Sequence, residues 1–319
     1  MGKAKHISSW FIYSGDKDVQ CLKPAFGILD SVSIQGEGVS EEFIRDCQRN
    51  GIATACLVVG GESKIESAEK TNETVQSYMA LLDRPGFDGI DVDYEHLDPS
   101  IQDKFSDFMR ALSGETHKRE KKLTICVGYW PSIYKEKYFY DPAVLAKTCE
   151  FVKVMCYDQY FAPGRMNAGL SHRADCRGLG PTSTNAYAGD ALDFWSRFIS
   201  PGKIIMGLPS YANDYDLATG KGTQIYDSRP PAGSKIVEDV WLWHERIRLY
   251  RYLDGDGHIH LFYASDSEST AMHLDTVTAR KLAGISFWEY HSVKPETWKI
   301  ITDRFCGSNR IFPHAARQH

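Results

Sequence analysis

Eight short runs of apolar and β-branched residues alternate along this chain with stretches whose apolar residues recur at helical spacing. Parallel strands need this order, because each strand must be followed by a crossover, usually a helix, before its neighbour begins. Eight such units in 319 residues predict an α/β fold, a closed (β/α)₈ TIM barrel rather than an open doubly wound sheet. The predicted strands are residues 6–13, 29–34, 53–59, 86–94, 123–129, 151–157, 203–208 and 284–290.

Two segments interrupt the alternation, and both follow predicted strands. Residues 159–189 resemble a long loop after the sixth strand, and residues 212–263 form a small insertion between the seventh and eighth. The insertion ends in a predicted hairpin, residues 249–253 and 258–263, joined by the turn Asp254-Gly255-Asp256-Gly257. Because the loops after barrel strands build the active-site face, we expect both segments to border the site.

Composition and charge argue against several classes of function. A net charge of −5 disfavours a protein held to nucleic acid by bulk positive charge, and no run approaches the roughly 20 apolar residues that span a bilayer. No signal peptide is visible, so we expect a soluble protein, secreted if a leader was removed and cytoplasmic otherwise. We expect a monomer with one catalytic domain over residues 1–306, insertion included, and a polar tail over residues 307–319. The eight cysteines form no CxxC pair and are expected to be buried free thiols.

Residues 87–95, Phe-Asp-Gly-Ile-Asp-Val-Asp-Tyr-Glu, place three carboxylates at alternate positions of a predicted strand. Side chains alternate between the two faces of a strand, so Asp91, Asp93 and Glu95 should point into the barrel while the apolar residues between them face the outer helices. Carboxylates this close share protons, which raises the pKa of at least one of them. A carboxyl group that keeps its proton at the C-terminal end of a barrel strand, as expected for Glu95, is what general acid catalysis requires.

Two other interpretations of this carboxylate row were weighed. An exposed acidic strand is disfavoured by the apolar residues between the carboxylates. Carboxylates also suit Mg²⁺ or Ca²⁺, but no clustered histidine or further carboxylate accompanies the row. The Asp254–Gly257 segment lacks the ligands that follow in a calcium loop and is interpreted as a turn. We therefore expect neither a metal nor a cofactor.

Residues 88–95 resemble DGxDxDxE, the motif of glycoside hydrolase family 18, which includes the chitinases and some endo-β-N-acetylglucosaminidases. Met155-Cys156-Tyr157-Asp158 is similar to the family's MxYD at the end of the sixth strand, residues 207–211 resemble the segment that closes the seventh, and residues 284–288 resemble the last strand. The predicted hairpin and the Trp288-Glu289-Tyr290 ending are most similar to bacterial members associated with cell-wall or spore hydrolysis.

This resemblance implies a retaining, substrate-assisted hydrolysis without a cofactor. Glu95 would protonate the leaving glycosidic oxygen while the substrate's own 2-acetamido oxygen attacks the anomeric carbon. Asp93 would hold the acetamido N–H, Tyr157 would donate to the acetamido carbonyl, and Asp91 would modulate the protonation of Asp93. The resemblance thus makes Glu95, Asp93, Asp91 and Tyr157 the catalytic residues.

Substrate-binding residues are expected near the strand ends. Trp288 matches the Trp that forms the floor of the family's −1 subsite, and Asp158 would bond the −1 sugar. Other aromatic residues there belong either to the core or to sugar platforms, since Trp and Tyr offer flat surfaces with a polar edge. The expected substrate-binding residues are Trp288, Asp158, Met155, Tyr211, Trp10 and Tyr129. Further stacking surface is expected from Tyr250, Tyr252 and Tyr263 of the insertion.

The chain departs from the family pattern around Asp91. The family often has SxGG at the third strand, where the Ser helps to hold the first inner Asp, but this chain has Val58-Val59-Gly60-Gly61. The first strand often supplies a Tyr for the same purpose, but here Trp10 and Phe11 occupy the vicinity. The motif therefore leaves open how Asp91 is held.

Three functions are compatible with these residues. The leading one is hydrolysis of β-1,4-linked N-acetylglucosamine in chitin or chitooligosaccharides. The second is an endo-β-N-acetylglucosaminidase that acts on N-glycans or peptidoglycan. The third is a non-catalytic, lectin-like barrel, which is less favoured because Glu95 is present. The partner in each case is an oligo- or polysaccharide that contains N-acetylglucosamine.

Overall fold

Eight parallel strands close into a barrel in the computed structural model, which describes residues 5–14, 19–36, 38–83, 86–128, 138–160, 164–165 and 179–306. This topology confirms the predicted (β/α)₈ fold class. The order around the barrel is β1 (His6–Ile12), β14 (Gly284–Trp288), β8 (Ile204–Pro209), β6 (Phe151–Met155), β5 (Lys122–Val127), β4 (Gly89–Tyr94), β3 (Ala53–Gly60) and β2 (Ser31–Gln35), which pairs with β1.

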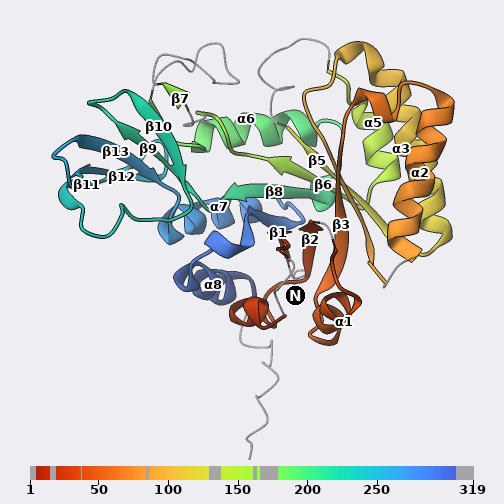
Figure 1. Ribbon diagram of the computed structural model, residues 1–319, viewed down its shortest axis with the longest axis horizontal. Helices are drawn as coiled ribbons and strands as arrows, with labels where there is room; N and C mark the ends of the chain where they lie inside the picture. Colours follow the sequence, from red (N-terminus) through yellow and green to blue (C-terminus); the bar gives the residue numbers. More distant parts are fainter. Residues whose placement is uncertain are drawn as a thin grey trace, which may run out of the picture.

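Helices cover the outside of the barrel, and α2, α3 and α5 form a layer at the right of Figure 1. Helix α6 begins at Asn185, inside the segment predicted to be loop, because the Thr184 hydroxyl caps it and accepts a hydrogen bond from Tyr187 N at 3.3 Å. The helices are α1 (Glu41–Arg49), α2 (Ala68–Asp83), α3 (Gln102–Lys118), α5 (Pro142–Thr148), α6 (Asn185–Ser196), α7 (Ser267–Ala279) and α8 (Pro295–Ile301). The short helical turns are η1 (Val19–Ala25), η2 (Glu62–Lys64), η3 (Pro99–Ile101), η4 (Pro201–Lys203), η5 (Tyr290–Ser292) and η6 (Thr302–Cys306).

A six-stranded antiparallel sheet lies beside the barrel, at the left of Figure 1. Its order is β11 (Lys235–Leu242), β12 (Ile247–Leu253), β13 (Ile259–Ala264), β9 (Ala212–Asp216), β10 (Lys221–Ile225) and β7 (Gly164–Arg165). Strands β12 and β13 form the predicted hairpin. Asp254 closes its turn by accepting hydrogen bonds from the backbone N–H groups of Asp256 at 3.0 Å and His258 at 2.8 Å. Strand β7, in a segment predicted to be loop, joins this sheet through β10.

The barrel wall separates two apolar regions. Outward-facing residues such as Ile90 and Val92 belong to the large core between the strands and the helices. Inside the barrel, a smaller cluster with Trp288 packed against it lies near the C-terminal ends of the strands. Gly207 allows this packing, because a Cβ there would lie 2.8 Å from Val154 O and 3.3 Å from the Trp10 ring. The inner cluster contains Trp10, Leu57, Cys126, Met155 and Tyr157.

The six cysteines whose side chains are described are all free, as predicted for them, and four of these are buried. Within the described residues, no helix is both long and apolar enough to cross a membrane.

Candidate active site

Strand β4 divides its side chains between the two sides of the barrel wall, as the alternation predicts. Ile90 and Val92 pack in the outer core, whereas Asp91 is fully buried inside the barrel. Asp93 follows on the same face and is half-buried, and Glu95, also half-buried, comes directly after the strand. The three carboxylates therefore form a row that rises from the barrel interior toward the C-terminal face.

Asp91 is held by side chains from the two strands that follow β4 in the barrel. Its Oδ1 accepts a hydrogen bond from Thr124 Oγ1 at 2.6 Å, and Cys126 Sγ lies 3.7 Å from Oδ2. Lys153 Nζ on β6 donates to the same Oδ2 at 2.7 Å, as a buried ion pair. A lysine, a threonine hydroxyl and a cysteine thiol thus hold Asp91 in place of the Ser and Tyr that the sequence lacks.

The position of the missing family serine is taken by Val58, which is 5% exposed and packs in the large core between the strands and the helices. Lys153 was not identified from sequence, although it left a signal there. Within the otherwise apolar run Phe151–Met155, Lys153 lies two positions before Met155, so both side chains face the barrel interior. Lysine is almost never fully buried unless it is paired. A lysine that faces the barrel interior therefore predicts a carboxylate partner inside the barrel.

The pKa values of Asp93 and Glu95 lie far above the usual carboxylate range. Burial, the charge of Asp91 and, in the opposite direction, the charge of Lys153 leave the pKa of Asp93 raised to about 7. Burial, followed by the charges of Asp93 and Asp158, raises the pKa of Glu95 to about 8. These two neighbouring groups together retain a proton at neutral pH, which equips Glu95 to act as an acid.

Contacts at the end of β4 fix the backbone position from which the Glu95 side chain extends. The ring of Tyr94 stacks on Phe108 of α3, with centroids 5.4 Å apart, and its hydroxyl hydrogen-bonds the Tyr78 hydroxyl at 2.9 Å. The carbonyl of Tyr94 accepts a hydrogen bond from the Tyr140 hydroxyl at 2.9 Å. All three contacts lie on the residue that immediately precedes the acid.

Asp158, three residues beyond the end of β6, is fixed by residues that are distant in sequence. Its backbone N–H donates to Thr182 Oγ1 at 3.0 Å, and its Oδ1 accepts hydrogen bonds from the Tyr211 hydroxyl and from Gln224 Nε2, the latter at 3.1 Å. Burial raises the pKa of Asp158, while these donors act in the opposite direction. Sequence analysis missed Thr182 and Gln224, which belong to polar segments without a distinguishing pattern.

Tyr157 and Trp288 meet around Trp10 at the C-terminal end of the barrel interior. The Trp10 ring lies edge-on to Trp288 and to Tyr157, with centroids 6.0 Å and 6.2 Å away. Trp288 is half-buried and retains an exposed part, whereas Trp10 is only 1% exposed. Burial raises the pKa of Tyr157 well above its usual value, so its phenol remains a hydrogen-bond donor.

The expectation of a sugar platform is wrong for two of the aromatic residues, because both rings are buried. Trp10 lies beneath Trp288, and Tyr211 is also only 1% exposed because its hydroxyl is engaged with Thr182 and Asp158. Neither ring has a face free to stack on a sugar. Met155 belongs to the inner apolar cluster below the site. Tyr129 lies outside the described residues.

The insertion reaches the site through β10 rather than through its hairpin. Gln224 at the end of β10 bonds Asp158, and the neighbouring Tyr226 ring lies 5.6 Å from that of Tyr211 with its side chain 46% exposed. The expectation that Tyr250 and Tyr252 offer stacking surface is wrong, because both are buried in the core of the insertion sheet. Tyr226 is thus an exposed aromatic residue beside the site that the sequence did not single out.

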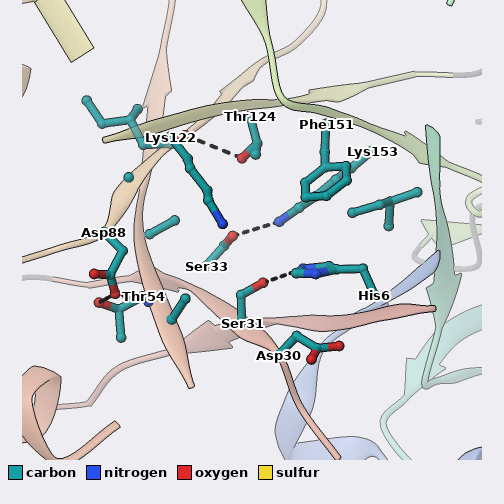
Figure 2. Close-up of a pocket in the computed structure, with 15 residues that line it drawn as sticks. His6, Asp30, Ser31, Ser33, Thr54, Asp88, Lys122, Thr124, Phe151 and Lys153 are labelled. Atoms are coloured by element: carbon teal, nitrogen blue, oxygen red, sulfur yellow. Dashed lines mark hydrogen bonds between the residues drawn. The ribbon is translucent and has the colours of Figure 1, made fainter. Parts of the chain in front are cut away.

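Across the described part of the chain, no three His, Cys, Asp or Glu side chains are grouped so as to hold a metal ion. A cavity of about 280 Å³ lies at the opposite end of the barrel from Glu95, among the N-terminal residues of the strands. Figure 2 shows this cavity, with the Lys153 amine directed at the Ser33 hydroxyl.

The model of Glycosyl hydrolases family 18 matches residues 18–292 of the chain. Among curated proteins, the chain is 22% identical to a cortical fragment-lytic enzyme of Bacillus anthracis over 312 residues, which cover 93% of this chain and 67% of the relative. It is 21% identical over 229 residues to an uncharacterized glycosylase of Bacillus subtilis, with 70% of this chain and 63% of that protein covered. The match to the Bacillus subtilis cortical fragment-lytic enzyme spans 51% of that relative's length.

Solved structures show the same architecture. A chitinase from Chromobacterium violaceum superimposes with a TM-score of 0.77 at 18% identity, covering 94% of this chain and 98% of that one. The spore cortex-lytic enzyme SleL of Bacillus cereus gives a TM-score of 0.77 at 14% identity, covering 95% of this chain and 76% of that one. At these identities the likeness establishes the shared fold.

Proposed function

Because the chain belongs to glycosyl hydrolases family 18, we propose that it is a retaining hydrolase of β-1,4-linked N-acetylglucosamine in chitin or chitooligosaccharides. The observation that carries this proposal is the carboxylate row of β4, in which Glu95 has a pKa of about 8 at the C-terminal end of the barrel. The similarity to a chitinase fold and to family relatives supports it.

In the first step, Glu95 gives its proton to the leaving glycosidic oxygen while the substrate's 2-acetamido oxygen attacks the anomeric carbon from the opposite side. Oδ1 of Asp93 is buried and has no hydrogen-bond partner among the described residues, which suits it to accept the acetamido N–H. The Tyr157 phenol donates to the acetamido carbonyl, and the exposed part of Trp288 supports the sugar ring.

In the second step, ionised Glu95 takes a proton from water as that water attacks the anomeric carbon and opens the cyclic intermediate. The proton returns to Glu95, and the product keeps the configuration of the substrate. Asp158 orients this centre, since its own carboxyl group is held in place through Oδ1 by Tyr211 and Gln224.

Peptidoglycan is the second candidate substrate, because two of the relatives are cortical fragment-lytic enzymes and two similar structures are spore cortex-lytic enzymes. Mass spectrometry of products from chitooligosaccharides, peptidoglycan and an N-glycosylated protein, digested side by side, distinguishes the candidates. N-acetylglucosamine oligomers released chiefly from chitooligosaccharides support the proposal. Preferential release from peptidoglycan favours the second candidate, and intact substrates in all three digests contradict hydrolysis altogether.

The dependence of kcat/KM on pH should be bell-shaped, with its maximum between about pH 7 and pH 8. Glu95 must be protonated, and because its pKa is raised to about 8 the rate should persist well above the usual carboxylate range before falling. Asp93 must be ionised to accept the acetamido N–H, and its pKa of about 7 should set the acid limb. Initial rates on a chitooligosaccharide, measured from about pH 4 to about pH 10, check this predicted pH dependence. A maximum near pH 4 would contradict the assigned protonation states.

Tyr226→Ala should weaken binding of long oligosaccharides more than that of short ones, because the exposed ring lies beside the site on the insertion. A stacking contact worth about 1 kcal/mol corresponds to roughly a fivefold rise in KM. The control is Trp243→Ala, which removes a 73% exposed ring at the end of β11, the opposite edge strand of the same sheet. Equal KM changes for short and long substrates would place Tyr226 outside the groove.

A further inference from the structure

Lys153 is a charged side chain enclosed by the barrel. It is 3% exposed, and its Nζ donates to Asp91 Oδ2 and to Ser33 Oγ, both at 2.7 Å. The same ammonium group lies 5.0 Å from the centroid of the Trp10 ring. One lysine from β6 therefore contacts side chains from β4, β2 and β1 at a single point (Figure 2 shows its bond to Ser33).

This point lies directly behind the proposed catalytic centre. Asp91 is the inner neighbour of Asp93 in the carboxylate row, and Trp10 supports Trp288 through their edge-on contact at 6.0 Å. Lys153 thus reaches both the row and the aromatic floor without itself lying on the C-terminal face.

Stability alone does not account for a charged pair at this position. Burying two charges costs desolvation free energy that offsets their attraction, so an apolar pair of similar volume often serves the fold as well or better. Lys153 does place a fixed positive charge beside a row of negative groups, and solvent screens the field of this buried charge only weakly.

We propose that Lys153 is a positioning residue of the catalytic centre: its ammonium group fixes the Asp91 carboxylate and sets the electrostatic environment in which Asp93 and Glu95 share their proton. Together with the Thr124 hydroxyl, it holds the first inner aspartate in a chain that lacks the usual Ser and Tyr partners. The role deepens the proposed glycosidase function and rests on it.

The effect of Lys153 on the pKa of Asp93 can be measured because few other groups near Asp93 change charge in the same pH range. Burial is the largest cause of the raised pKa of Asp93, the Asp91 charge adds to it, and the Lys153 charge lowers it. Among the residues that the structure describes, the other titratable groups that interact with Asp93 are Glu95 on the same chain segment, Cys126 on β5, Tyr157 after β6 and Tyr140 before α5. Burial raises the pKa of the thiol and of both phenols well above their usual values, so these three stay neutral over the pH range of the experiment.

The cavity at the N-terminal end of the barrel supplies matched variants. Lys153 lines this cavity of about 280 Å³, so the larger guanidinium group of Lys153→Arg has room and retains the charge. Lys122 lines the same cavity from β5 but is solvent-exposed. Lys122→Met therefore removes a lysine charge from the cavity without removing a hydrogen bond to Asp91.

The experiment compares Lys153→Met, Lys153→Arg and Lys122→Met with the wild type by two readouts. The first is ¹³C NMR titration of the Asp93 carboxyl in the free protein, assigned by its loss in Asp93→Asn. The second is kcat/KM on a chitooligosaccharide as a function of pH. Lys153→Met should move the Asp93 titration and the acid limb upward by roughly one pH unit, the low end of what an opposite charge does to a nearby carboxylate. It should lower kcat more than it changes KM, whereas the other two variants should resemble the wild type.

Lys153→Met leaves the Asp91 charge buried and unpaired, so a second pair of variants covers the case in which it does not fold. The Asp93 titration is then compared between Asp91→Asn and Asp91→Asn/Lys153→Met, and the double variant should titrate at the higher pH. Unchanged titration and an unchanged pH profile on loss of Lys153 would overturn the proposal, whatever happens to thermal stability. A titration shift in a protein whose wild type hydrolyses no N-acetylglucosamine polymer would support the electrostatic link and overturn the proposed function instead.

Discussion

Glu95→Gln should abolish hydrolysis while leaving oligosaccharide binding largely intact. Glutamine has nearly the shape of glutamate but cannot deliver a proton to the leaving oxygen, and the loss of general acid catalysis typically costs about 10²–10⁴-fold in rate. The pKa of Glu95, raised to about 8 by burial and by the neighbouring carboxylates, keeps that proton available at neutral pH in the wild type. Turnover of a chitooligosaccharide, followed by chromatography of products, and calorimetric binding of the same ligand measure the two properties separately.

The control for this variant is Glu62→Gln, which neutralises an exposed glutamate just after β3 on the same face of the barrel. It should retain wild-type kinetics, because it changes charge near the site without touching the row. Near-wild-type turnover by Glu95→Gln on a substrate with a poor leaving group would remove Glu95 from the role of acid. Loss of binding together with turnover would instead assign it to substrate binding.

A substrate without the 2-acetamido group in the −1 sugar should bind and not turn over. The nucleophile in the proposed reaction is the acetamido oxygen. A well-oriented intramolecular group has an effective molarity of about 10⁵–10⁸ M, which corresponds to roughly 7–11 kcal/mol of the activation barrier. Asp91 and Asp93 lie deeper on the strand that carries the acid, and Asp158 is engaged by Tyr211 and Gln224. Neither inner aspartate is thus placed across the sugar ring from the acid, where a protein nucleophile would have to lie.

Three measurements test this requirement. Chitooligosaccharides and their fully deacetylated counterparts are compared for binding and for product formation, and a thiazoline analogue of the cyclised intermediate is tested as a competitive inhibitor. Intact-mass spectrometry under turnover looks for a covalent adduct. Efficient cleavage of the deacetylated oligomers, or a glycosyl adduct on Asp93 or Asp158, would contradict the substrate-assisted mechanism.

The positions that alternate along one strand were predictable because they depend on local geometry. The two-residue period of a strand places Asp91 inside the barrel and Ile90 outside it, whatever the rest of the chain does. The order of strand-like and helical segments likewise indicates a closed parallel barrel. The β12–β13 hairpin was visible for a similar reason, since its turn and its strands are contiguous.

Exposure at the strand ends was not predictable in this way. Trp10, Tyr211 and Tyr226 are all aromatic residues near the site, yet only Tyr226 has an exposed ring. Trp10 is covered by Trp288 of the last barrel strand, and Tyr211 is buried where its hydroxyl meets Thr182 and Asp158. Those contacts join residues far apart in the chain, and no short-range pattern of polarity records them.

The sequence by itself determined the closed barrel, the inward row of carboxylates and the family motif. Side-chain alternation along a strand and the order of the elements depend only on residues that are neighbours in the chain. The tertiary structure decided what surrounds that row. Lys153 meets Asp91 across 62 positions of sequence, and Gln224 meets Asp158 across 66, because barrel closure and strand register bring them together. The charge that faces each carboxylate depends on such distant partners, so the chemistry of the row follows from the fold as much as from the motif.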